Sequence, residues 1–385
     1  MPIYLDSNAT SQIDPEVIEA MLPFLREHYA NPSSAYRMAK PARDAVATAR
    51  REVAAMLGGD PDEIVFTSCG TESNNTAIAS ALALYPEKRH VITTAAEHDA
   101  VLAPCQALEE HGLEVTYLGV NEGGLIDLEE LRAALRPGET ALVSILWANN
   151  ETGVIAPVAE AAAIAHEAGA LVHTDAVQAF GKIPVSVTEA DVDMLSLSGH
   201  KFHAPKGVGV LYLSSRVRFE PQLLGGGQES GRRSGTENVA GIVALGTAAR
   251  LMGEHDEAEV QALRDQFENG LRTRVPDYEI NGDPAHRLPT TSSLYFPGID
   301  AAGLLLLLDD EDVCASAGSA CHTSALHSSH VLAAMGFDRR RASGTMRFSF
   351  SRFNVSEEVE QAVEIIASKV EKMRSLRTSG PIRRA

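Results

Sequence analysis

The segment Ala141-Leu142-Val143-Ser144-Ile145-Leu146-Trp147 is a short, mostly apolar run of the kind that forms a buried β-strand. An Ala-rich helical pattern follows over residues 158–168, and a second apolar run covers residues 171–174. A strand, a helix and a second strand in this order are typical of a βαβ unit, whose strands lie parallel beneath the helix. The segment therefore predicts an α/β fold.

The same alternation extends from this unit toward both ends of the chain. Strand-like runs cover residues 64–66, 91–92, 115–118, 193–198 and 208–213, and helical patterns cover residues 75–84, 101–108 and 128–135. We therefore expect a mainly parallel sheet covered by helices between residues 63 and 213.

Beyond a helical stretch at residues 239–252 and a charged helix around residues 254–274, the pattern changes to α+β. Strands are expected at residues 292–296 and 346–350, and helices at residues 301–308 and 357–373. We expect a second, smaller unit here. Its basic tail, residues 374–385, is predicted to fray.

Composition places the chain among ordinary globular proteins. With 385 residues, 44% of them hydrophobic, it can bury a large core in two domains or in one domain with a lobe. The formal charge of -19 disfavours binding to nucleic acid or to an anionic membrane. The N-terminus carries no secretion signal, and the longest aliphatic run, residues 304–308, is far too short to span a bilayer. We expect a cytoplasmic protein without membrane contact.

The four cysteines form no CxxC pair and no disulfide framework, so we expect reduced thiols. Cys321 lies among small and polar residues, which indicates an accessible, reactive thiol. Packing roles are expected for Cys69, Cys105 and Cys314. The remaining candidates for chemistry near Cys321 are His322, His327 and His330. Their spacing matches no zinc pattern, so an exposed loop is favoured over a metal site.

The segment Ser196-Leu197-Ser198-Gly199-His200-Lys201 is a strand that ends in a small, polar turn with a lysine at its exit. Such a lysine can form a Schiff base with an aldehyde cofactor, provided that burial and a cationic neighbour such as His200 keep its amine partly neutral. A surface lysine in a Gly-rich loop is the alternative.

An aspartate ends the preceding strand in Leu171-Val172-His173-Thr174-Asp175. Pyridoxal phosphate (PLP) acts as an electron sink while its pyridine nitrogen is protonated, and a buried carboxylate such as Asp175 would maintain that state. A helix N-cap is the alternative role for Asp175.

Two further segments could bind the phosphate of such a cofactor. The turn Ser68-Cys69-Gly70-Thr71 joins a strand to a helix start, where free backbone N–H groups favour anions. Residues 225–236 form a Gly- and Arg-rich loop that offers more donors, or that is simply solvated.

Together these segments resemble the cysteine desulfurases of the nitrogen-fixation and iron–sulfur-assembly type, which share the class V aminotransferase fold. The resemblance runs from Tyr4-Leu5-Asp6-Ser7-Asn8-Ala9-Thr10 to Arg347-Phe348-Ser349. Between them stand Thr94-Ala95-Ala96-Glu97-His98, Trp147-Ala148-Asn149-Asn150-Glu151-Thr152-Gly153, Ser198-Gly199-His200-Lys201, Arg233-Ser234-Gly235-Thr236 and Gly318-Ser319-Ala320-Cys321.

The resemblance implies the PLP-dependent transferase (aspartate aminotransferase-like) fold. Its large PLP-binding domain would comprise residues 15–256. Its small domain would comprise residues 1–14 and 257–385 and carry the catalytic cysteine loop, residues 315–329. The scarcity of bulky apolar residues in that loop predicts that it is mobile.

The resemblance also implies a role for each matching residue. Lys201 would hold PLP and move the substrate Cα proton, His98 would stack on the pyridine ring, and Cys321 would receive the sulfur as a persulfide. Arg347 would bind the substrate carboxylate, although a plain salt bridge is its alternative role. The other implied contacts are Asp175 at the pyridine nitrogen, Asn150 and Gln178 around the phenolic oxygen and the substrate, Gly70, Thr71, Ser198 and His200 at the phosphate, and Thr236 from the partner subunit of a homodimer.

The implied reaction converts L-cysteine to L-alanine and passes the sulfur from Cys321 to an acceptor protein, such as an iron–sulfur scaffold. A selenocysteine lyase, another PLP lyase or aminotransferase of this fold, and a catalytically silent scaffold are the alternatives. Two departures from the family pattern occur: Ser351 stands where a Gly is usual, and Leu326-His327-Ser328-Ser329 replaces the usual Leu-Glu-Pro-Ser. The first change is expected to alter packing beside the carboxylate site. The second is expected to alter loop mobility or acceptor preference.

Overall fold

The computed structural model describes residues 2–317 and 329–378, and its larger unit is built on one twisted sheet. The strand order is β2-β8-β7-β6-β5-β3-β4. All neighbours are parallel except β8, which is antiparallel to both β2 and β7. The strands are β2 (Ile64–Thr67), β3 (His90–Thr94), β4 (Glu114–Leu118), β5 (Thr140–Leu146), β6 (Leu171–Asp175), β7 (Met194–Ser198) and β8 (Gly209–Leu213). The predicted mainly parallel sheet is confirmed.

Helices cover both faces of this sheet, because its strands are apolar on both sides. Successive strand residues enter different cores: Ile64 and Phe66 pack in one cluster, and Val65 packs in the other. The first cluster includes residues of α2 and α7, and the second includes residues of α3 and α4. The helices of this unit are α1 (Pro15–Arg26), α2 (Lys40–Leu57), α3 (Gly70–Leu84), α4 (Asp99–Glu110), α5 (Leu128–Ala134), α6 (Val158–Glu167) and α7 (Val239–Met252).

The smaller unit surrounds its own core, and the N-terminal segment belongs to it. Ile3 and Leu5 pack in this core with residues of α8, α9 and α12. Its antiparallel sheet has the order β12-β13-β10-β9, and β1 (Ile3–Tyr4) pairs in parallel with β11 (Val313–Cys314). The other elements are α8 (Glu257–Arg274), β9 (Glu279–Ile280), β10 (Thr291–Tyr295), α9 (Ala301–Asp309), β12 (Ser316–Ala317), α10 (His330–Ala334), α11 (Arg339–Ser343), β13 (Thr345–Ser349) and α12 (Ser356–Thr378).

Several elements differ from the sequence-based expectation. Helices α1 and α2 were not predicted, and neither were the two-residue strands, which are too short to show a period. The expectation of a frayed tail from residue 374 is wrong for its first part, because α12 continues to Thr378 and Arg374 donates to Asp277 and to the Pro297 carbonyl. No helix among the described residues is long and apolar enough to cross a membrane.

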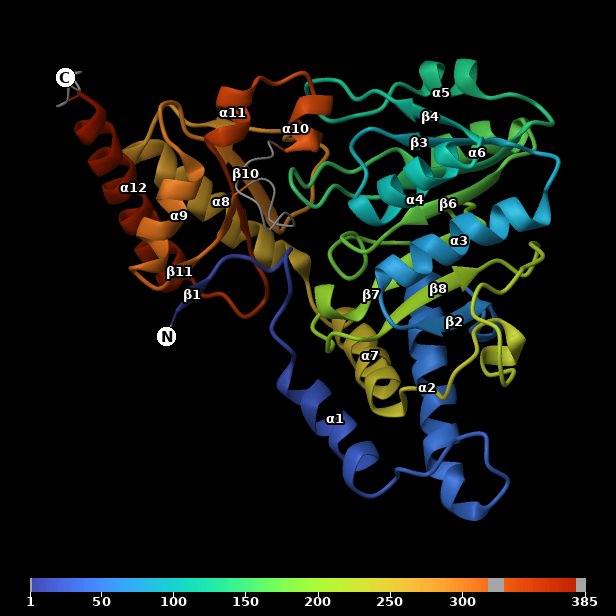
Figure 1. Cartoon of the computed structure of the whole chain (residues 1–385). Coiled ribbons are helices and arrows are strands. Elements are labelled where there is room, and N and C mark those ends of the chain that lie inside the picture. Colours follow the sequence, from blue (N-terminus) through green and yellow to red (C-terminus); the bar gives the residue numbers. More distant parts are fainter. Residues whose placement is uncertain (1, 318–328, 379–385) are drawn as a thin grey trace, which may run out of the picture.

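The two units meet along the carboxyl ends of the central parallel strands, where open α/β sheets bind ligands. In Figure 1 the N-terminal segment passes along this boundary between β1 and α1. Residues far apart in the sequence therefore come together at this edge.

Candidate active site

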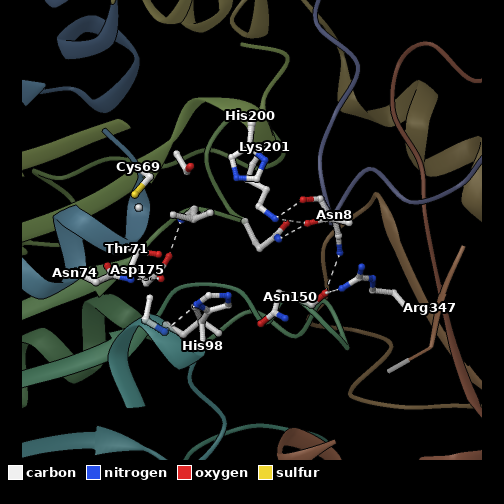
Figure 2. A pocket seen from close by; sticks show the side chains of 17 residues that line it. Asn8, Cys69, Thr71, Asn74, His98, Asn150, Asp175, His200, Lys201 and Arg347 are labelled. Atoms are coloured by element: carbon white, nitrogen blue, oxygen red, sulfur yellow. Dashed lines mark hydrogen bonds between the residues drawn. The ribbon is translucent and has the colours of Figure 1, made fainter. Parts of the chain in front are cut away.

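A cavity of about 360 Å³ lies at this edge and is lined by residues of both units. Figure 2 shows Thr71, Asn74 and Asp175 at one end of it and Arg347 at the other, with His98, Asn150 and Lys201 between them. The sequence analysis singled out most of this lining. Predicted residues that line the cavity are Gly70, Thr71, His98, Asn150, Asp175, Gln178, Ser198, His200, Lys201 and Arg347.

Asp175 ends β6 and is almost fully buried. One carboxylate oxygen accepts from the Val177 backbone N–H at 3.0 Å, and the other accepts from Asn74 Nδ2 at 2.6 Å. Asp175 therefore makes the turn contact expected of a capping residue and also faces the cavity, where its carboxylate can meet a protonated ring nitrogen.

The turn from β2 into α3 forms the wall beside Asp175. Cys69 is fully extended, and Gly70 begins α3, so the first N–H groups of this 15-residue helix are available to an anion. A Cβ at Gly70 would come within 2.7 Å of Val177 Cγ2, so the close approach requires glycine. Cys69 lines the cavity as well. Cys105, by contrast, is fully buried, and burial raises its thiol pKa to about 12.

Lys201 ends the short helical turn η3 (Gly199–Lys201) that follows β7. Its Nζ donates to the backbone carbonyls of Asn8 at 2.6 Å and Ala9 at 2.8 Å. His200, which was predicted to be a cationic neighbour of Lys201, is not cationic. Burial, together with the charge of Lys201, lowers the pKa of His200 to about 4, so His200 is neutral at neutral pH.

His98 caps the N-terminus of α4 and lines the cavity at the same time. Its Nδ1 accepts from the Ala100 N–H at 3.0 Å, so a neutral His98 carries its proton on Nε2. This capping contact fixes the orientation of the ring.

Arg347, on β13, supplies a guanidinium at the opposite end of the cavity. It donates to Asp6 at 2.8 Å and to the Asn150 carbonyl at 2.9 Å. Its Nε and the Asn150 side-chain oxygen are buried, and neither has a hydrogen-bond partner among the described residues. Arg347 is therefore part of a salt bridge and still has a donor for a ligand carboxylate.

Two buried glutamates lie behind the wall that carries His98. Glu97 accepts from the Leu146 N–H at 2.8 Å and from the Thr94 hydroxyl at 3.0 Å, and burial raises its pKa to about 8. Burial likewise raises the pKa of Glu151 to about 7, although it accepts from the Ser329 hydroxyl. Glu97 is therefore largely protonated at neutral pH.

Thr236 does not line this cavity in the described chain. Thr236 is exposed and lines a separate cavity of about 190 Å³ beside Arg233. Cys321 lies outside the described residues, as do most of the loop expected to be mobile, the histidines at 322 and 327, and Ser328. The described ends of that loop are bonded: Ser316 pairs with Arg347 in β12 and β13, and Ser329 donates to Glu151.

His330 follows the loop and is among the described residues. Its Nε2 contacts the backbone carbonyl of Glu97 at 2.8 Å. Within residues 2–317 and 329–378, no group of three or more His, Cys, Asp or Glu side chains could hold a metal ion. Ser351, one of the two departures, lines a smaller cavity behind Lys201, and its N–H donates to Asn354.

Sequence reasoning missed three residues that shape the site. Asn8 and Asn74 line the cavity, and Lys182 is buried behind it with bonds to Asn8 and Gln178. Asn8 was quoted only as part of a motif. A buried lysine carries no local signal, because burial depends on which distant segments cover it.

Comparison with known proteins agrees with this geometry. The family described as Aminotransferase class-V matches residues 3–362. A cysteine desulfurase from Trichormus azollae is 50% identical over 377 residues, covering 97% of this chain and 94% of the relative. The cysteine desulfurase NifS of Azotobacter vinelandii is 47% identical over 378 residues, with the same coverage. A solved structure of a NifS-like protein has a TM-score of 0.90 at 40% identity and covers 97% of this chain and 100% of that one.

The chain therefore belongs to the class V aminotransferases and, within them, to the cysteine desulfurases. Enzymes of this family depend on PLP. The cavity fits that cofactor, because it offers a buried carboxylate, a helix N-terminus and a lysine amine in one enclosure. The Asn74 side-chain oxygen at the Asp175 end is also buried, with no partner in the part of the chain that the structure describes.

Proposed function

We propose that Lys201 holds PLP in this cavity and that Cys321 receives the sulfur of L-cysteine as a persulfide. The observation that carries this proposal is the order of groups along one cavity: carboxylate, helix N-terminus, lysine and guanidinium. This order matches a cofactor with its ring nitrogen at Asp175 and a substrate with its carboxylate at Arg347.

The phosphate would lie at the start of α3. There the backbone N–H groups of Gly70 and Thr71 and the hydroxyl of Ser198 can donate, with neutral His200 nearby. Thr236 would complete this site from the partner subunit of a homodimer, which is consistent with its exposure here. Dimerisation would thus complete both sites.

When bound, PLP would supply an electron sink for the substrate Cα carbanion. Lys201 Nζ would move the Cα proton. His98, held by its cap contact, would present Nε2–H to the reacting groups. Asn150 and Gln178 would orient the substrate and the phenolic oxygen of the cofactor. Arg347 would bind the substrate carboxylate with its guanidinium, which lines the cavity.

In the reaction one sulfur atom leaves the cysteine Cβ and bonds to Cys321. The products are alanine and a Cys321 persulfide, and no external oxidant is consumed. We further propose that an acceptor protein, for example an iron–sulfur scaffold, takes the sulfur in the cytoplasm.

We also propose that residues 15–256 form the PLP-binding domain and that residues 1–14 and 257–385 form the small domain, since separate cores support this division.

The Cys321→Ser variant tests the sulfur step. It is expected to bind PLP and L-cysteine normally, but to lose sustained alanine formation by roughly a hundredfold or more, because the acceptor thiolate is absent. Alanine release and persulfide labelling measure this, with Cys314→Ser as the matched control. If Cys321→Ser forms alanine as fast as the unaltered protein, the persulfide role is wrong. Keto-acid formation in its place would identify an aminotransferase.

A further inference from the structure

Lys182 is a buried lysine to which the proposed reaction gives no role. Only 6% of it is exposed, in the turn region after β6. Its Nζ donates to Gln178 Oε1 at 2.7 Å and to Asn8 Oδ1 at 3.0 Å. Burying a lysine is unfavourable unless its donors are bonded, so this arrangement requires explanation.

The contact with Lys182 fixes the orientation of the Gln178 side-chain amide. A lysine nitrogen donates hydrogen bonds to both acceptors in its charged form and still has two N–H bonds when neutral. Gln178 must therefore turn Oε1 toward Lys182 and Nε2 away from it. The Asn8 carbonyl agrees, since it accepts from Gln178 Nε2 at 2.9 Å. The second Nε2 hydrogen remains for an acceptor in the cavity, such as the phenolic oxygen of PLP.

The contact with Asn8 holds the segment against which Lys201 rests. The Asn8 carbonyl accepts from Lys201 Nζ and from Gln178, and the Asn8 side chain bonds to Lys182 and to Thr291. Lys182 thus reaches Lys201 through a single residue. Since Asn8 lies more than 170 positions from Lys182, only the folded chain creates this link.

Lys182 and Lys201 lie close enough that the charge of Lys201 affects the protonation of Lys182. A cavity of about 20 Å³, large enough for one water molecule, is lined by both lysines. The other titratable groups that face it are His203, Glu257 and Arg352. Burial and the charge of Lys201 lower the pKa of Lys182 to about 7. His200 is neutral at neutral pH, whereas Lys182, with a pKa of about 7, carries part of a positive charge beside Lys201.

We propose that Lys182 is a positioning residue for the PLP site: it orients the Gln178 amide with its donor toward the cavity and holds the Asn8 segment against Lys201. This inference rests on the proposed function, because it assumes that PLP occupies the cavity.

The test compares Lys182→Met with Gln178→Met, the double variant and Lys206→Met in the PLP-loaded full chain. Methionine keeps the length and loses the donors. Lys206 is an exposed lysine of the same loop as Lys201, so its removal deletes a nearby charge without touching Gln178. Two quantities are measured: the pH midpoint of the absorbance change of bound PLP, and kcat/KM for L-cysteine.

Lys182→Met is expected to raise the midpoint by roughly half a pH unit or more, since a positive charge and an oriented donor are lost. It should lower kcat/KM roughly tenfold, whereas Lys206→Met should change neither quantity. In the Gln178→Met background the effect of Lys182→Met on kcat/KM should shrink to about twofold. Lys182→Gln serves if the methionine variant does not fold, and its midpoint should also rise.

An unshifted midpoint in Lys182→Met, or equal effects of that change with and without Gln178, would overturn the inference. If the unaltered chain itself bound no PLP or formed no alanine from cysteine, the proposed function would fail instead. The two failures are therefore distinguishable.

Discussion

The two ends of the cavity are built in different ways. At the Asp175 end, the groups come from strand ends and the turns that directly follow them, and Asp175 bonds to a backbone N–H two residues away. At the Arg347 end, the partners lie 341 and 197 positions from the arginine. One end is a property of the parallel sheet, and the other exists only when two units and the N-terminal segment meet.

This difference shows which functions each end can support. The sheet end is rigid and buried, and therefore suits a cofactor that stays in place. The far end depends on contacts among three separate segments, and therefore suits a substrate that arrives and leaves. Lys201 connects the two, because it leaves β7 at the sheet end and bonds to the N-terminal segment.

The change with the largest expected effect removes this connection. Lys201→Ala is expected to lose the covalent attachment of PLP and to lower turnover roughly a thousandfold or more, since both attachment and proton transfer disappear. Visible absorbance after gel filtration and the rate of alanine formation measure the two losses. Exposed Lys206, changed to alanine, is the control. An undiminished cofactor absorbance in Lys201→Ala would remove Lys201 from the site.

The next change separates the two ends. Arg347→Ala is expected to raise KM for L-cysteine roughly tenfold to a hundredfold while PLP stays bound, because the guanidinium contacts only the substrate end. Asp6 loses its ion-pair partner, so melting curves must accompany the kinetics. Arg347→Lys restores the charge but not the planar fork, and should recover only part of the affinity. If PLP is lost and KM is unchanged, the assignment of the two ends is reversed.

The sequence alone predicted the sheet end well, for a physical reason. Asp175, Ser198 and Lys201 each follow an apolar run, and parallel strands bring their carboxyl ends to one edge. Arg347 and Asn150 were assigned through the family resemblance only. Asn8 and Lys182 received no role, since no local pattern shows which distant backbone covers a side chain. Helices α1 and α2 were missed for a related reason: both pack chiefly on α7, which is distant in the sequence.

Glu97 is fully buried and does not line the cavity, and a change there is expected to have the smallest effect on activity. It bonds to the ends of β3 and β5, and its own backbone carbonyl accepts from His330 on α10. Its second carboxylate oxygen is buried without a partner among the described residues, as suits a protonated acid. Gln has nearly the same shape as the neutral form, keeps the acceptor oxygen that Leu146 and Thr94 use, and is likewise uncharged, so Glu97→Gln should fold and turn over cysteine within about twofold of the unaltered chain.

The stability of the Glu97→Gln variant should depend on pH differently from that of the unaltered chain. Because the folded pKa of Glu97 is raised to about 8, above its ordinary value of 4.5, the folded chain binds this proton more tightly than the unfolded chain does. The stabilisation this provides is complete below the ordinary value and is lost as the pH rises to about 8. Glu97→Gln does not titrate, so relative to the unaltered chain it should gain on the order of 4 kcal/mol between pH 5 and pH 9. Urea unfolding at several pH values measures this, and exposed Glu110→Gln should show no such gain. A difference between Glu97→Gln and the unaltered chain that stays constant across this range would mean that the pKa of Glu97 is not raised and that Glu97 is ionised in the folded protein.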